Sequence, residues 1–338
     1  MVLTARALVQ AGKGILAADE TPGTIGKRFE ALGIPSTTQS RLAYRDLLVT
    51  APGLEGVISG VILQDETFRQ ATSSGSLFPQ ALIQRGMLAG IKVDTGAKPL
   101  AKAPGEKVTE GLDGLRERIA EYVELGARFA KWRAVITIGA GIPTRACIAA
   151  NAHALARYAA LCQEGGLVPI VEPEVLMDGD HSIERCFAVT VTTWRTVFAE
   201  LAEQGVALDA MVLKPSMILP GKQHSTQATV DEVARRTVQG LRQTVPAAVP
   251  GIAFLSGGQS PDLATRHLQV INALGPQPWQ LTFSFARALQ DEALSAWKGE
   301  ARNVGHAQAA LVNRTRAVAA ARSGADRAAK EPASASDS

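Results

Sequence analysis

Eight short apolar stretches recur along the chain, and each is followed by a longer segment that contains the pattern of an amphipathic helix. The stretches are rich in β-branched residues and apolar on both faces, which is typical of strands buried in a parallel sheet. They cover residues 14–19, 56–63, 88–93, 128–136, 167–175, 209–218, 251–256 and 280–285. The helical pattern is clearest at 112–125, 144–163, 182–203, 228–243 and 261–274.

Strand and helix alternate over about 290 residues, which favours a single-domain α/β protein with a (β/α)8 TIM barrel. A doubly wound open sheet is the alternative, but no GxGxxG turn follows the first strand. We expect the barrel to occupy residues 1–320. Residues 321–338 are mainly Ala, Ser and charged residues, so we expect them to form a flexible tail.

The composition argues against several classes of protein. It is 46% hydrophobic and 20% charged, as in ordinary soluble enzymes, and the net charge of +3 is too small to indicate a nucleic-acid partner. We find no apolar run of the roughly 18 residues that a transmembrane helix needs. Arg6, Gln10 and Lys13 interrupt the segment where a signal peptide would be apolar. Three scattered cysteines are too few for a disulfide framework, so we expect a cytoplasmic protein. The missing apolar run leads us to expect no membrane partner.

Charged residues occur inside or at the ends of the predicted strands, where a barrel usually has Val, Ile or Leu. They are Asp19, Lys92, Lys131, Arg133, Glu172, Glu174, Lys214 and Arg287. Residues two apart share a face of a strand. Lys131 and Arg133 should therefore point to the same side, and so should Glu172 and Glu174. A buried, unpaired charge costs several kcal/mol, so these groups should be partnered or functional. We expect them in the C-terminal halves of their strands, where barrel active sites are built.

Each of these residues also has a structural interpretation. A Lys or Glu near a strand end can simply extend into solvent, and Asp19 could cap the following helix. Glu172 and Lys131 could form an ion pair with no catalytic role. The convergence of so many charges on one end of one barrel nevertheless favours an active site.

Lys214 is the most distinctive of these residues. In MVLKPSMIL it is the only charge in a nine-residue apolar run, and Pro215 argues against a helix there. Burial and a neighbouring ammonium, for which Lys131 is the candidate, both favour the neutral form of such an amine. A neutral lysine attacks a carbonyl carbon to form a Schiff base, so we predict Lys214 to be the catalytic nucleophile.

The segment FLSGGQSPD at 254–262 is the candidate phosphate site. Ser256, Gly257 and Gly258 follow the seventh strand, and a helix begins at Pro261. Glycines let backbone N–H groups approach an anion, and a helix N-terminus adds positive partial charge. Barrels frequently bind phosphate with the loops after strands 7 and 8, and Arg287 follows strand 8. The alternative is an ordinary glycine turn.

A metal cofactor is not expected. The five histidines show neither HxH nor HExxH spacing, so they offer no zinc-binding cluster in the sequence. They are His153, His181, His224, His267 and His306.

From about residue 11 to residue 298 the sequence resembles class I fructose-bisphosphate aldolases, which form a Schiff base. The motifs that carry the resemblance are GKGILAADE at 12–20, GIKVD at 90–94, KWR at 131–133, VEPE at 171–174, LKPSM at 213–217, FLSGGQS at 254–260 and LTFSFARALQ at 281–290. Several of these motifs are specific alone, and here they occur in the order of the family.

The resemblance implies a role for each catalytic residue. Lys214 would form the Schiff base, and Glu172 would shuttle protons as the carbinolamine forms and loses water. Asp19 would take the C4 hydroxyl proton while the C3–C4 bond breaks, and Lys131 would support charge beside it. Glu174 would complete the polar wall of the site. No cofactor is implied beyond the covalent Schiff base.

The resemblance also implies two phosphate clamps on a small sugar phosphate substrate. Ser256, Gly257, Gly258, Ser284 and Arg287 would bind the C1 side, and Lys92, Thr21, Thr24 and Arg28 would approach the C6 phosphate. Arg133 would bind substrate as part of the polar wall that Glu174 completes. The family further suggests a homotetramer and a role in glycolysis.

Three departures from the family pattern stand out. Thr21-Pro22-Gly23 stands where the family usually has Ser-Thr-Gly, so the hydroxyl survives but proline stiffens the loop. Ala286 stands where a glycine is common. The last tyrosine is Tyr158, whereas many family members end in a tyrosine that assists proton exchange on the enamine.

Two further interpretations stay open at this point. One is a related Schiff-base aldolase or transaldolase that acts on a monophosphorylated sugar. The other is a non-catalytic scaffold, because a fold does not dictate a function. Preference between fructose 1,6-bisphosphate and fructose 1-phosphate is also open.

Overall fold

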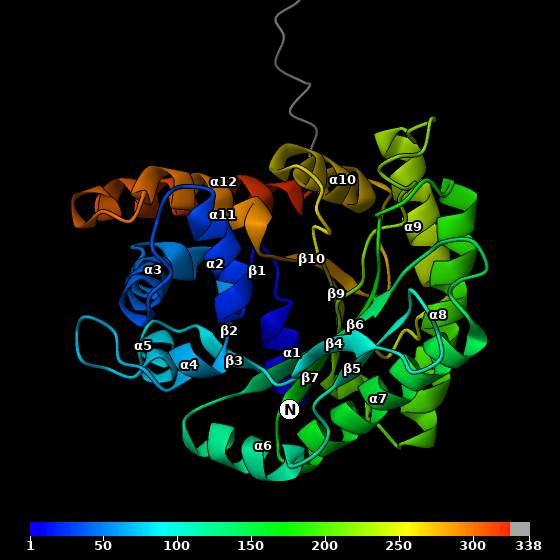
Figure 1. The fold of residues 1–338 in the computed structure, drawn as a ribbon, viewed down its shortest axis with the longest axis horizontal. Coiled ribbons are helices and arrows are strands. Elements are labelled where there is room, and N and C mark those ends of the chain that lie inside the picture. The colour runs from blue at the N-terminus through cyan, green and yellow to red at the C-terminus, as the bar shows by residue number, and fades with distance from the viewer. Residues whose placement is uncertain (325–338) are drawn as a thin grey trace, which may run out of the picture.

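The computed structural model describes residues 1–324. Its eight parallel strands close into a barrel, which confirms the predicted fold class over the open sheet (Figure 1). Around the barrel they are β1 (Gly14–Ala18), β2 (Ile58–Leu63), β3 (Leu88–Lys92), β6 (Phe129–Ile136), β7 (Val168–Val175), β8 (Val212–Leu213), β9 (Gly251–Phe254) and β10 (Gln280–Phe285), and β10 pairs with β1.

The sixth barrel strand, β8, is much shorter than predicted. The sequence indicated a strand over 209–218, but only Val212 and Leu213 have strand geometry, after a 3-10 turn at Leu208–Ala210. Proline has no N–H, so Pro215 cannot continue the ladder as a donor. The backbone still holds its place, because Lys214 N donates to Val171 O at 2.8 Å and Leu255 N donates to Pro215 O at 3.0 Å.

All five predicted helices are present, and the side chain before the first residue caps four of them. They are α6 (Leu115–Glu124), α7 (Arg145–Glu164), α8 (Ile183–Glu203), α9 (Val230–Thr244) and α10 (Pro261–Ala273). Thr144, Ser182, Thr229 and Ser260 each accept a hydrogen bond from the backbone N–H three residues on. Such caps satisfy N–H groups that the helix itself leaves free.

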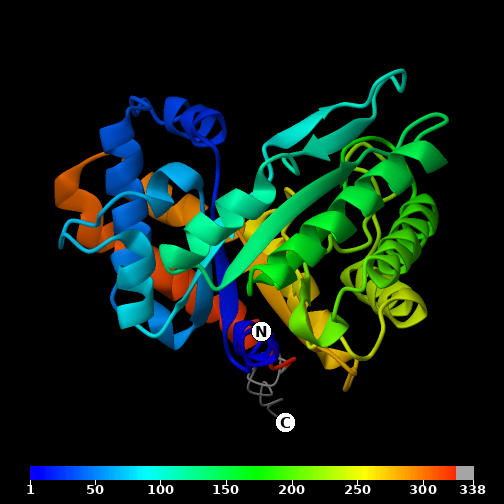
Figure 2. The ribbon, with the colours of Figure 1, turned by 90° about the horizontal axis from the view of Figure 1, so that it is seen from below.

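The structure adds elements that the sequence pattern did not reveal. The further helices are α1 (Val2–Leu8), α2 (Pro22–Glu30), α3 (Thr38–Thr50), α4 (Asp65–Phe68), α5 (Phe78–Gln84), α11 (Arg287–Trp297) and α12 (Val304–Ala321), with 3-10 turns at Leu54–Gly56 and Ala301–Asn303. An antiparallel hairpin, β4 (Gly96–Pro99) and β5 (Lys107–Glu110), projects beside the barrel (Figure 2). Thr109 Oγ1 donates to Arg133 O at 2.7 Å and ties the hairpin to β6.

The barrel interior is apolar at the end where the strands begin. Side chains that alternate inward along the strands form one cluster, which the residues of α1 close from below. The cluster is Ala5, Leu8, Val9, Ile15, Ala17, Ile62, Phe129, Val168, Ile170, Val212 and Ala253. Gly90 is required here, because a Cβ at this position would lie 2.2 Å from the Phe129 ring. A second, larger cluster fills the space between the strands and the helices.

The end of α12 is fastened beneath the barrel. Arg322 donates to Val9 O at 3.1 Å and to Gln10 O at 2.5 Å, and it also bonds Lys13 O just before β1. From residue 325 onward, the tail predicted for 321–338 lies outside the described residues. Among residues 1–324, none of the helices combines the length and the apolar character that crossing a membrane requires.

Candidate active site

Strand alternation places the charged residues directly above the apolar interior. Asp19 follows Ile15 and Ala17 on one face, and the same spacing places the other charges above Phe129, Ile170 and Val212. The side chains so placed are almost fully buried: Asp19, Lys131, Glu172, Glu174 and Lys214 are 3–8% exposed. The alternative that they merely extend into solvent does not apply to them.

The expectation that every charge lies in the C-terminal half of its strand is wrong for Lys131. This residue is the third of eight in β6, and β6 and β7 are longer than the other strands. Lys131 pairs in register with Lys92, the last residue of β3. Lys131 therefore lies level with the C-terminal end of β3, although it is near the start of β6.

Four of these residues form one continuous ionic network. Lys131 Nζ lies 2.7 Å from Asp19 Oδ2 and 3.4 Å from Glu172 Oε2. Lys214 Nζ lies 3.1 Å from Glu172 Oε1. Glu172 is thus held between two ammonium groups from different strands. Its Oε2 has no hydrogen-bond partner among the described residues, so the contact with Lys131 is one of charge alone.

The network fixes the ionisation of Asp19 and Lys131. Burial would raise the pKa of Asp19, but the charges of Lys131 and Lys214 and a hydrogen bond from Lys131 lower it to about 2. Burial would lower the pKa of Lys131, but Asp19 and Glu172 outweigh it and raise that pKa well above its ordinary value. Asp19 is therefore a carboxylate at neutral pH, able to accept a proton, and Lys131 stays cationic.

A second group of charges lies beside this network. Arg133 is paired with Glu174 through its Nε, and Lys92 Nζ donates to Asp94 Oδ1 at 2.6 Å. Asp94 Oδ2 also accepts from Arg133 N at 3.3 Å. Asp94 was not among the residues predicted for the site, although it is the last residue of the GIKVD motif, because nothing in the strand pattern showed which cation it would pair with.

Ser284 carries a hydroxyl with no hydrogen-bond partner among the described residues, although it is 1% exposed. Its neighbours Phe283 and Phe285 pack in the outer core, so Ser284 lies on the opposite, inner face of β10. Most buried polar atoms in proteins are hydrogen-bonded, so this hydroxyl on the inner face of β10 is a candidate for a contact with substrate.

The predicted phosphate segment forms a tight turn between β9 and α10. Gly257 and Gly258 have φ angles of 60° and 86°, a region that favours glycine. A Cβ built on Gly258 would lie 3.1 Å from Arg287 Nη2 and 3.0 Å from Lys222 Nζ. The structure therefore brings the turn and Arg287 together as expected, and it adds a lysine that the sequence pattern did not indicate.

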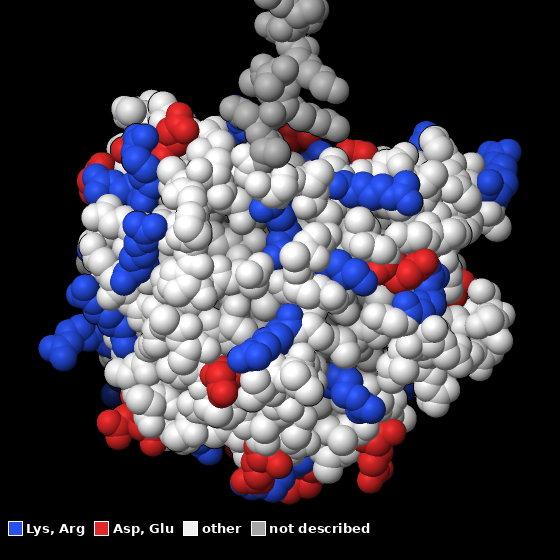
Figure 3. Space-filling view, turned by 180° about the vertical axis from the view of Figure 1, so that it is seen from behind, with Lys and Arg blue, Asp and Glu red and all other residues white. Residues whose placement is uncertain are grey.

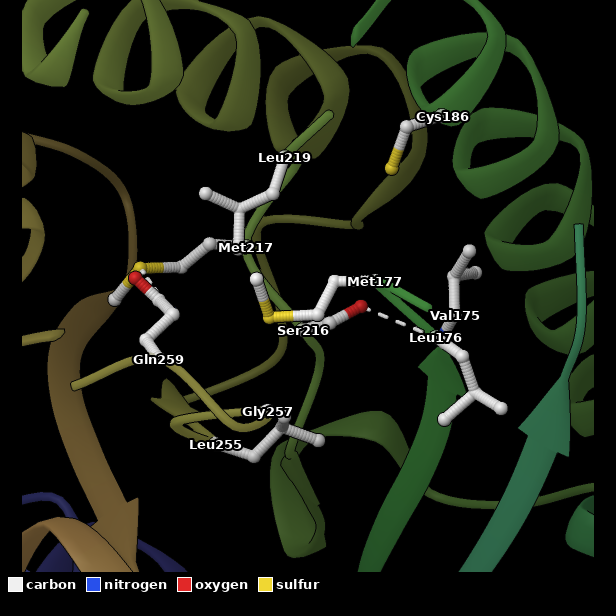
Figure 4. Close-up of a pocket in the computed structure, with 10 residues that line it drawn as sticks. All are labelled: Val175, Leu176, Met177, Cys186, Ser216, Met217, Leu219, Leu255, Gly257 and Gln259. Atoms are coloured by element: carbon white, nitrogen blue, oxygen red, sulfur yellow. Dashed lines mark hydrogen bonds between the residues drawn. The ribbon is translucent and has the colours of Figure 1, made fainter. Parts of the chain in front are cut away.

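A small, mainly apolar pocket lies beside this turn (Figure 4). It is lined by Val175, Leu176, Met177, Cys186, Ser216, Met217, Leu219, Leu255, Gly257 and Gln259. Gln259 Oε1 lies 2.6 Å from His267 Nδ1, and Gln259 Nε2 donates to Met217 Sδ at 3.7 Å. Burial lowers the pKa of His267 to about 4, so this histidine is neutral and serves the packing.

The residues predicted after the first strand are only partly brought to the site. Thr21 caps α2, with Pro22 at the first helical position, and it lines a cavity of about 470 Å³ together with Lys92. Thr24 and Arg28 do not line that cavity. Arg28 instead bonds Glu20 at 2.6 Å, Asp291 at 3.0 Å and Gln290 at 3.1 Å.

On the face drawn in Figure 3, single basic side chains are spread over the surface, and acidic side chains lie beside some of them and along the lower edge. Within the part of the chain that the structure describes, no group of three or more His, Cys, Asp or Glu side chains is arranged to hold a metal ion.

Comparison with known proteins identifies the family of this chain. The family model described as fructose-bisphosphate aldolase class-I matches residues 1–338. The chain belongs to this family. A probable fructose-bisphosphate aldolase class 1 of Xanthomonas campestris pv. campestris is 58% identical over 294 residues, which is 87% of this chain and 88% of that protein. The cytosolic fructose-bisphosphate aldolase 4 of Arabidopsis thaliana is 50% identical over 90% of this chain and 78% of its own length.

A solved structure of the same family has the same fold as this class I aldolase chain. It is the fructose-bisphosphate aldolase of Plasmodium falciparum in complex with TRAP and a small-molecule inhibitor. The TM-score is 0.94 at 48% identity, and the match covers 96% of this chain and 94% of that one. The resemblance noted in the sequence is thereby confirmed over nearly the whole chain.

Proposed function

We propose that this chain reversibly cleaves fructose 1,6-bisphosphate to dihydroxyacetone phosphate and glyceraldehyde 3-phosphate through a Schiff base on Lys214. The observation that carries the proposal is the buried Lys214–Glu172–Lys131–Asp19 network at the barrel rim. It supplies an amine, a proton shuttle and a proton acceptor side by side, which is what imine chemistry on a ketose requires.

The steps up to cleavage of the C3–C4 bond can each be assigned to one of these groups. The Lys214 amine attacks the C2 carbonyl, and Glu172 protonates the carbinolamine hydroxyl, which leaves as water. Asp19 then takes the C4 hydroxyl proton. The C3–C4 bond breaks, its electron pair moves to C3, and the iminium accepts it as an enamine. Glyceraldehyde 3-phosphate leaves, C3 is protonated, and hydrolysis releases dihydroxyacetone phosphate and the free amine. The iminium is the electron sink, so this route needs no metal.

The two phosphate groups of the substrate anchor it across the network. We assign the C1 phosphate to Ser256, Gly257, Gly258, Ser284 and Arg287, and the C6 phosphate to Lys92, Arg133 and Thr21. Thr24 and Arg28 join the C6 side through resemblance alone. Binding energy at both ends aligns the scissile bond with Asp19.

Replacing Lys92 with methionine separates a bisphosphate enzyme from the monophosphate alternative. The KM for fructose 1,6-bisphosphate should rise about tenfold or more, because a cation to phosphate is lost. The KM for fructose 1-phosphate should hardly change. An Asp94→Asn variant controls for the broken Lys92–Asp94 pair. A KM for fructose 1,6-bisphosphate that hardly changes would favour the monophosphate alternative.

Replacing Ser284 with alanine tests whether its hydroxyl serves the substrate. No hydrogen bond is lost in the free protein, so the free energy of unfolding should change by no more than about 0.5 kcal/mol, while the KM rises several-fold. Ser59→Ala is the matched control, since its buried hydroxyl donates to Leu8 O at 2.6 Å and should cost about 1–3 kcal/mol. Thermal unfolding and steady-state kinetics of both variants decide the point. An unchanged KM in Ser284→Ala contradicts the assignment.

The remaining assignments concern the setting of the enzyme. We propose a cytoplasmic homotetramer acting in glycolysis, with residues 1–320 as one catalytic domain. The support is the family itself and the cytosolic relatives from plants.

A further inference from the structure

We infer that Lys222 is a second cationic ligand of the phosphate site at Gly258 and Arg287, and that it sets affinity for the C1 phosphate. This inference rests on the proposed function, which places that phosphate at the glycine turn. One point in space, the Cβ position of Gly258, lies 3.0 Å from Lys222 Nζ and 3.1 Å from Arg287 Nη2. Two cations therefore lie beside Gly258, where the backbone carries no side chain.

The backbone around Lys222 is held in place by a second loop. Lys222 N donates to Met177 O at 2.8 Å, and the residues on either side bond the same loop: Gly221 N donates to His181 O at 2.8 Å and Gln223 N to Gly179 O at 2.9 Å. The loops approach so closely that a Cβ on Gly221 would lie 2.2 Å from Gly179 O. The position of Lys222 is thus fixed by backbone contacts between the loop that follows β7 and the segment that follows β8.

The partner of Lys222 in the free protein is easily displaced. Its ammonium lies 3.2 Å from Asp178 Oδ1, and the two side chains are 42% and 63% exposed. Exposed pairs of this kind contribute little, because water and salt screen both charges. A phosphate dianion brings more charge, and a lysine ammonium has three donors, so it can bind phosphate in place of Asp178 or beside it.

The arrangement favours a fully ionised phosphate group. Arg287 supplies a planar guanidinium, Lys222 supplies a compact charge, and the N-terminus of α10 adds partial charge two residues beyond the turn. Fructose 1,6-bisphosphate and fructose 1-phosphate both carry the C1 phosphate. Lys222 should therefore affect both substrates alike, in contrast to Lys92.

The test compares Lys222→Gln, Lys222→Arg and Asp178→Asn with the wild-type enzyme. In Lys222→Gln the KM for both substrates should rise about tenfold, kcat should stay within about twofold, and inorganic phosphate should inhibit about tenfold more weakly. Lys222→Arg should recover most of the affinity. Asp178→Asn should leave KM unchanged or lower it, because it frees the ammonium. Lys98→Gln, an exposed lysine on the hairpin, is the control for net charge.

Two outcomes overturn the inference. One is a wild-type KM and a wild-type phosphate inhibition constant in Lys222→Gln. The other is an equal loss in Lys222→Gln and Asp178→Asn, because that would make the ion pair a structural support of the loop. Calorimetric binding of inorganic phosphate to the wild type and to Lys222→Gln tests the role of Lys222 even if Lys214 forms no adduct. A failure of the inference can therefore be told apart from a failure of the proposed function.

Discussion

The Lys214→Met variant is expected to lose aldol cleavage by on the order of 10⁴-fold or more, because removing a covalent nucleophile removes the reaction path itself. Methionine keeps most of the side-chain volume, and Glu172 keeps Lys131 as a charged neighbour. The protein should therefore stay folded and still bind substrate. Steady-state kinetics with fructose 1,6-bisphosphate, together with substrate protection against thermal unfolding, measure both effects.

Two controls sharpen this result. Lys222→Gln removes a lysine at the same end of the barrel but should lower affinity, not kcat. EDTA should leave wild-type activity intact, because the iminium serves as the electron sink. A Lys214→Met enzyme that cleaves within tenfold of the wild-type rate would contradict the Schiff-base assignment.

The Lys131→Met variant is expected to be strongly destabilised, more so than Lys214→Met. It leaves Asp19 buried without its nearest cation, and breaking a buried pair in this way costs about 3–5 kcal/mol of unfolding free energy. Activity should fall as well, since Asp19 would no longer be held as a carboxylate. Denaturant unfolding at neutral pH, followed by kinetics on the folded fraction, measures the two losses.

The pH dependence of the same variant has a defined sign. Asp19 has a pKa of about 2 in the folded protein against an ordinary 3.8, so its ionisation stabilises the fold by about 2 kcal/mol above 3.8. That stability is lost as the pH falls through about 2. The gap between wild type and Lys131→Met should therefore narrow on acidification. Arg116→Met, which breaks an exposed pair with Glu164, should show almost no gap at any pH. A gap that widens at low pH would contradict the network as described.

Among the described residues, no tyrosine hydroxyl contacts the Lys214 network. All three tyrosine hydroxyls are engaged away from the Lys214 network: Tyr44 with Gln290 at 3.1 Å, Tyr122 with Asp65 at 2.8 Å and Tyr158 with Ile170 O at 3.2 Å. Burial also raises the pKa of Tyr158 well above its usual value. We therefore propose none of these three hydroxyls as the proton donor to the enamine.

Much of the barrel could be predicted because its determinants are local. Apolar, β-branched runs bounded by helical periodicity located all eight strands, and strand alternation alone placed Lys131 and Arg133 on one face. The burial of Lys214 also followed from its apolar neighbours. These features depend on residues within a few positions of one another, so a single sequence contains them.

The features that were missed depend on contacts between distant segments. The position of Lys222 follows from hydrogen bonds between the loops around residues 179 and 221, which no local pattern encodes. In the same way, Arg28 was assigned to phosphate by resemblance, whereas the fold pairs it with Asp291 at a separation of 263 residues.

Trapping the covalent intermediate is the decisive test of Lys214 as the Schiff-base lysine. The wild-type enzyme is reduced with borohydride in the presence of fructose 1,6-bisphosphate, digested, and analysed by peptide mass spectrometry. We expect one reduced sugar-phosphate adduct on Lys214, absent from Lys214→Met and unaffected by EDTA. An active enzyme that yields no adduct, or an adduct on Lys131 in place of Lys214, would contradict this assignment.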